Sequence, residues 1–77
     1  MAADMTLLRA PIGLPLVLDE VSTSPVAARR LLTFGLREGA SLTLLQRTAS
    51  GGRIALVGES RIALGKDVCK QLGVSRG

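Results

Sequence analysis

Short stretches of branched apolar residues, separated by turns rich in glycine and proline, run along most of the chain and predict a mainly β protein. The predicted strands are residues 14–21, 41–48, 53–57 and 61–64. Within 41–48 the alternation of apolar and polar residues slips at Leu45, which predicts a β-bulge. Ile54 and Leu56 face one way in the third strand, and Ile62 and Leu64 face inward in the fourth.

A helix is predicted immediately after the first strand. Ser24 can cap it, because its hydroxyl can accept from a free backbone N–H, and Pro25 suits the first helical position. One face carries Ala27, Leu31 and Phe34 at helical spacing. Gly35 can adopt the left-handed conformation that ends helices, and Leu36 would then fold back onto Leu31.

A second helical segment is predicted at residues 65–72, because Val68 and Leu72 share a face and Gly73 can end it. The predicted order is strand, helix, three-stranded meander and short helix. Strand faces and helix faces must be buried against one another. Short strands with regular turns in so small a chain therefore predict a β-barrel, which also removes exposed strand edges.

The length of 77 residues allows one domain. We expect a disordered N-terminus at 1–4, the domain at 5–74 and a loose C-terminus at 75–77. No apolar run approaches the roughly 20 residues that span a bilayer, so no direct membrane insertion is expected. The first residues lack the pattern of a signal peptide, and the expected location is cytoplasmic.

Candidate chemistry is sparse. The chain has no histidine and a single cysteine, Cys69, which is most simply a small buried apolar residue. The carboxylates are scattered along the sequence, and transition-metal sites usually combine imidazole with carboxylate or thiolate ligands. Acid–base catalysis lacks its usual groups as well. We therefore expect neither a metal site nor a cofactor nor an enzyme.

The chain is basic, with ten lysines and arginines against six acidic residues and a net charge of +4. A basic surface favours an anionic partner, although a solvated surface is the simpler interpretation. Nucleic-acid surfaces commonly stack bases on aromatic rings. Phe34 is the one aromatic residue, and its helical position predicts that it lies in the core. Nucleic acid is therefore not the expected partner.

A protein-binding surface is predicted around the end of the first helix. Its candidate residues are Arg29, Arg30, Leu36 and Arg37. Arginine suits such a role because its guanidinium pairs carboxylates through a bidentate fork. Leu36 has two interpretations, a contact that caps the helix or an exposed anchor.

The stretch from Arg30 to Gly39, with a helix that ends in a Leu-Gly-Leu-like turn, resembles the signature of the ferrous iron transport protein A (FeoA) family. A leucine-rich strand, a glycine-containing hairpin and the segment 58–64 follow in the family's order, so the resemblance covers about residues 5–74. Phe34 stands where the family usually has leucine, and Glu38 where it usually has proline.

The resemblance implies a small SH3-like β-barrel and a role beside the membrane ferrous iron transporter that carries a cytoplasmic GTPase domain (FeoB-like). The implied function is an accessory protein that binds and regulates or assists that transporter. A related SH3-like domain ends the iron-dependent repressors, so one fold has several uses. The alternative is an SH3-like module in metal-dependent regulation or self-association, and a homo-oligomer fits either function.

Overall fold

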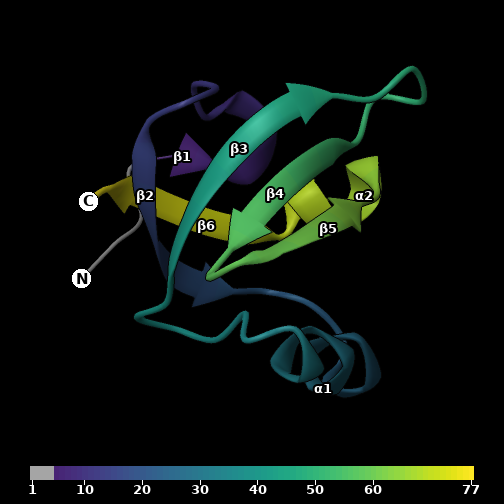
Figure 1. The fold of residues 1–77 in the computed structure, drawn as a ribbon. Helices are drawn as coiled ribbons and strands as arrows, with labels where there is room; N and C mark the ends of the chain where they lie inside the picture. The colour runs from purple at the N-terminus through teal and green to yellow at the C-terminus, as the bar shows by residue number, and fades with distance from the viewer. Residues whose placement is uncertain (1–4) are drawn as a thin grey trace.

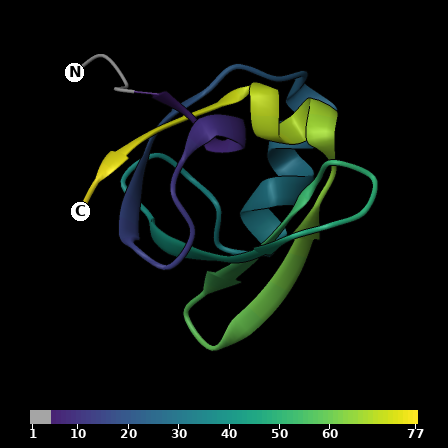
Figure 2. The ribbon, with the colours of Figure 1, turned by 90° about the horizontal axis from the view of Figure 1, so that it is seen from above.

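The computed structural model describes residues 5–77 and contains one antiparallel six-stranded sheet that curls around a core (Figures 1 and 2). Along the sheet the strands follow the order β1-β6-β2-β3-β4-β5. The strands are β1 (Met5–Thr6), β2 (Pro15–Val21), β3 (Ser41–Arg47), β4 (Arg53–Val57), β5 (Ser60–Leu64) and β6 (Leu72–Arg76). A 3₁₀ turn, η1 (Leu7–Arg9), and the helices α1 (Pro25–Thr33) and α2 (Lys66–Lys70) complete the fold. The arrangement is a small SH3-like barrel, as predicted.

Strand β2 curves the sheet, because it pairs with β3 through its first half and with β6 along most of its length. The register between β2 and β6 shifts between Leu18 and Glu20. A second shift, between Leu44 and Gln46, interrupts the pairing of β3 with β4 and confirms the bulge predicted at Leu45. Such irregularities increase local twist and bend a strand, which lets a short sheet wrap around its own core.

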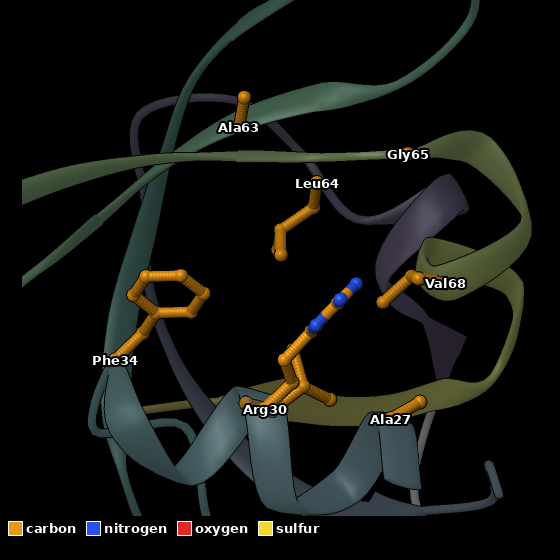
Figure 3. A pocket seen from close by; sticks show the side chains of 8 residues that line it. Ala27, Arg30, Phe34, Ala63, Leu64, Gly65 and Val68 are labelled. Carbon is orange, nitrogen blue, oxygen red and sulfur yellow. The ribbon is translucent and has the colours of Figure 1, made fainter.

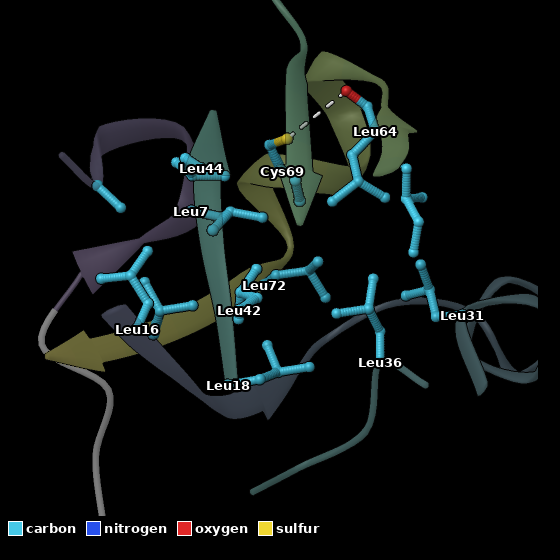
Figure 4. Packing of buried hydrophobic residues seen from close by; sticks show 14 residues of the cluster. Leu7, Leu16, Leu18, Leu31, Leu36, Leu42, Leu44, Leu64, Cys69 and Leu72 are labelled. Atoms are coloured by element: carbon cyan, nitrogen blue, oxygen red, sulfur yellow. Dashed lines mark hydrogen bonds between the residues drawn. The ribbon is translucent and has the colours of Figure 1, made fainter. Parts of the chain in front are cut away.

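The core consists mainly of leucine side chains, contributed by β2, β3, β5 and β6 together with η1, α1 and the loop after α1 (Figure 4). Its fully buried large side chains are Leu7, Leu16, Leu18, Leu36, Leu44, Leu72, Val74 and Cys69. The inward positions predicted in β5, Ile62 and Leu64, are also buried. Ile54 and Leu56 share one face of β4, as predicted, and this face is half-buried. The opposite face, with Arg53 and Ala55, is the buried one.

The last segment differs from the sequence prediction. Helix α2 ends at Lys70, and residues 72–76 form β6, which lies between β1 and β2. Leu72 and Val74 are both buried two residues apart, which is the spacing of a strand. The pairing of β6 with two neighbours outweighs the local helical pattern. A loose C-terminus at 75–77 is therefore wrong, since Ser75 pairs with Val17, and the predicted disordered segment 1–4 lies outside the described residues.

Helix α1 begins and ends as predicted. The Ser24 hydroxyl accepts a hydrogen bond from the Ala27 N–H at 3.2 Å. At the other end the Gly35 N–H donates to the Leu32 carbonyl and the Leu36 N–H donates to the Leu31 carbonyl, both at 3.0 Å. Those two bonds form a Schellman cap, and the accompanying contact buries Leu36 beside Leu31.

The cap predicts a large effect for Gly35→Val. Gly35 has φ of 82°, where a β-branched residue is strained. A Cβ there would meet Val57 at an ordinary 3.6 Å, so the cost comes from the backbone and not from a clash. We expect a loss of about 2–3 kcal/mol in the free energy of unfolding, seen as a lower melting temperature. Gly65→Val is the control, because Gly65 has φ of −67° and its loss should stay under about 1 kcal/mol. Equal losses would refute the left-handed cap.

Candidate functional site

Exposed apolar side chains gather on and beside α1. Val26 is 76% exposed, Leu32 55% and Phe34 48%, and Leu31 is the helix's buried residue. Figures 1 and 2 show that α1 lies at one end of the curled sheet. These side chains are candidates for interaction surfaces, and they lie on different sides of the helix, since Phe34 and Leu32 line different hollows.

A groove of about 410 Å³ lies between α1 and the end of β5, and we call it the α1 groove (Figure 3). The α1 side contributes Ala27, Arg30, Leu31 and Phe34. The opposite wall consists of Ala63, Leu64, Gly65 and Val68. The face predicted from the helical spacing of Ala27, Leu31 and Phe34 thus does turn toward the barrel. Leu31 packs into the core, but a gap remains between the rest of this face and the opposite wall.

The α1 groove is apolar apart from one cation. Figure 3 shows the Arg30 side chain rising from α1 toward Leu64 and Val68. Among the described residues, Arg30 is the one charged residue of the lining, and no carboxylate lines the groove. A guanidinium in such a setting can pair with a ligand carboxylate through two parallel hydrogen bonds.

A second hollow, of about 270 Å³, lies on another side of α1. It is lined by Val21, Ala28, Leu32, Leu36, Arg37 and Glu38. Here the arginine has an acidic neighbour in the lining, so the hollow is electrostatically mixed. The two hollows therefore differ in charge although both flank the same helix.

The structure separates the four residues predicted to bind protein. Arg30 lines the α1 groove, Arg37 lines the second hollow, and Arg29 is exposed on α1 in the lining of neither. Leu36 is 1% exposed, which settles its two interpretations in favour of the cap contact. Leu36 as an exposed anchor is wrong, because the Schellman cap turns its side chain into the core.

Two side chains beside α1 depart from the sequence prediction. Phe34 does not lie in the core, because it is the C-cap residue of α1 and its ring stands at the rim of the groove. The argument against nucleic acid that relied on its burial is therefore wrong. Val26 and Leu32 were not predicted as surface features. Their signal was present, since apolar residues occur on more faces of this helix than one contact with the core can cover.

Cys69 is buried, as predicted, and its thiol donates to the Leu64 carbonyl oxygen at 3.8 Å. Burial raises the pKa of this thiol above its ordinary value of 9.0, although the nearby positive charge of Arg53 lowers it in part. The thiol therefore stays neutral at physiological pH and is a poor nucleophile or metal ligand. Over residues 5–77, no three carboxylate, histidine or cysteine side chains gather in a group that could hold a metal ion.

No helix in the described part of the chain is long and apolar enough to cross a membrane. The curled sheet with its flanking groove places the chain in the class of small SH3-like barrel domains. A family model described as the FeoA domain matches residues 5–76. The chain therefore belongs to the FeoA family, as its resemblance in sequence implied.

Solved structures of several proteins share the fold. Iron(II) transport protein A from Clostridium thermocellum is 22% identical, with a TM-score of 0.85 over 94% of this chain and 45% of that one. An iron uptake regulatory protein (FeoA) is 25% identical, with a TM-score of 0.84 over 95% of this chain and 97% of that one. ScaR, in a structure with bound Zn²⁺, is 20% identical, with a TM-score of 0.85 over 97% of this chain and 38% of that one.

This chain thus spans less than half of the Clostridium protein and of ScaR. A search of curated protein sequences gave no match.

Proposed function

We propose that this protein is a non-catalytic, cytoplasmic accessory protein that binds the membrane ferrous iron transporter and regulates or assists it. The partner implied by the family is a transporter with a cytoplasmic GTPase domain. The observation that carries the proposal is the concentration of exposed apolar side chains on α1, where Val26, Leu32 and Phe34 are each about half exposed or more. Protein interfaces rely on such apolar and aromatic anchors with arginine beside them.

The test is retention of the transporter's purified cytoplasmic domain by the immobilised protein. We expect the parent protein to retain it, and we expect Phe34→Asp to weaken retention by roughly tenfold or more, since it places a charge in the apolar contact. Leu14→Asp is the matched control. Leu14 is also an exposed apolar residue, at 42%. It precedes β2, and the chain continues into α1 from the opposite end of that strand. Failure of the parent to bind would refute the proposed partner, and equal losses for both variants would refute α1 as the surface.

A second candidate is a module in metal-dependent regulation or self-association. It is favoured by the shared fold of ScaR, which was solved with bound Zn²⁺, and of the manganese regulator SloR, 17% identical with a TM-score of 0.84. This chain covers 35% of SloR, which supports a common fold but not a common activity. Stoichiometric metal in the purified protein, or a stable dimer without any transporter, would favour this candidate.

A further inference from the structure

The α1 groove and the second hollow differ in a way that selects among ligands. The α1 groove combines apolar walls with the single cation of Arg30, whereas the second hollow carries Arg37 beside Glu38. A cation among apolar walls favours the binding of a ligand that has both an apolar group and a negative charge. A ligand with only one of these properties would leave either the guanidinium or the apolar walls without a partner.

We propose that the α1 groove binds a peptide segment of a partner protein in which an apolar side chain stands next to a carboxylate. The carboxylate pairs with the Arg30 guanidinium, and the apolar side chain enters the gap between Leu31 and Leu64, with the Phe34 ring at the rim. The inference deepens the proposed function. It rests on that function for one point, that the partner is a protein. It adds which hollow is used and which peptide chemistry is recognised.

Three observations favour such a peptide over other occupants. The volume of about 410 Å³ is that of a site for a few side chains. Val26 lies one turn before Arg30 on α1 and is 76% exposed, so the apolar surface continues past the groove along the helix. A ligand that covers both is longer than the groove. The charge of +4 on this chain makes an acidic partner more favourable than a second copy.

The structure provides a way to block the groove without disturbing the fold. Gly65 lines the groove and has φ of −67°, and a Cβ built on it meets no atom of the described residues within 4 Å. Gly65→Leu therefore fills part of the groove from its wall. Ser60→Leu is the matched control, because Ser60 is exposed at the opposite end of β5. For the charge, Arg30→Glu is paired with Arg47→Glu, since Arg47 is exposed at the end of β3 and absent from both hollows.

The probe is an acetylated peptide of alternating leucine and glutamate, about ten residues long. It is titrated into the ¹⁵N-labelled protein at moderate ionic strength while the amide resonances are followed. We expect shifts centred on Arg30, Gly65 and Val68, and a roughly tenfold or greater weakening by Arg30→Glu and by Gly65→Leu. The control variants should bind like the parent. A peptide with lysine in place of glutamate should not bind.

Each result has a defined reading. The inference is overturned if the glutamate peptide does not bind, if the lysine peptide binds equally well, or if the control variants lose as much as the groove variants. It is also overturned if a thymidine oligonucleotide of similar length shifts the same amides and binds more tightly, since the groove would then serve nucleic acid. Retention of the transporter domain by the parent and by Arg30→Glu alike leaves the proposed function standing and rejects this groove. Binding of the peptide without retention of the transporter domain leaves this groove standing as a peptide site and rejects the proposed transporter partner.

Discussion

Leu44→Ala will lower the free energy of unfolding by about 2–5 kcal/mol. Leu44 is fully buried in the middle of β3, opposite Ala55 of β4. Ala55, its neighbour across the strand pair, is too small to fill the cavity left by its removal. A chain of this length has a total stability of about 4–12 kcal/mol. The substitution therefore removes a large part of it.

The measurement is urea denaturation followed by circular dichroism, with the midpoint and slope compared between variants. Leu45→Ala is the matched control, because Leu45 is the next residue along β3, sits at the bulge and is only half-buried. We expect Leu45→Ala to lower the free energy of unfolding by clearly less than Leu44→Ala does. Similar losses for both residues would contradict the assigned inward face of β3.

The strands and the main helix were predictable because their signals are local. Ser24, Pro25 and Gly35 determine where α1 begins and ends through their own backbone preferences and hydrogen bonds. The bulge at Leu45 was visible as a break in a two-residue alternation. Each of these features depends on residues within a few positions of one another, so the sequence alone indicates them.

The missed features depend on contacts between distant segments. Strand β6 exists because its neighbours β1 and β2 supply hydrogen-bonding partners from the other end of the chain. The local spacing of Val68 and Leu72 predicted a helix there instead. The α1 groove was missed for a similar reason. Helical periodicity indicates which face turns toward the barrel, but not whether the helix packs onto it closely.

Arg53 is the clearest case of a side chain whose role depends on distant contacts. It begins β4 and is 8% exposed, although a charged residue at a strand end is ordinarily solvated. Its guanidinium donates to the carbonyl oxygens of Gly51 at 3.0 Å, Gly52 at 2.8 Å and Leu8 at 2.7 Å. The side chain therefore joins the hairpin loop between β3 and β4 to the 3₁₀ turn η1. Within residues 5–77 the buried Nε atom finds no hydrogen-bond partner, which offsets part of this gain.

Arg53→Met should lower the free energy of unfolding by roughly 2–5 kcal/mol. Hydrogen bonds to a charged group contribute about 1.5–3 kcal/mol each, and three are lost. The relief of a desolvated guanidinium offsets part of that loss, and methionine retains much of the side-chain volume. The Gly52 carbonyl keeps its bond from the Thr48 N–H. Most of the expected loss therefore comes from the carbonyls of Gly51 and Leu8, which lose the donor that Arg53 supplies.

The control is Arg47→Met, because Arg47 pairs with Arg53 in register across β3 and β4 but is exposed to solvent. A solvated arginine should cost little, within about 0.5 kcal/mol. Hydrogen exchange gives a second readout, in which Arg53→Met should speed exchange at η1 and at residues 49–52 before the rest of the barrel. The free energy of unfolding of Arg53→Lys should be close to that of Arg53→Met, since an ammonium lacks the planar fork that reaches carbonyls on two segments. If Arg53→Met is as stable as the parent, the cost of burying the guanidinium cancels its hydrogen bonds, and the side chain does not hold these segments together.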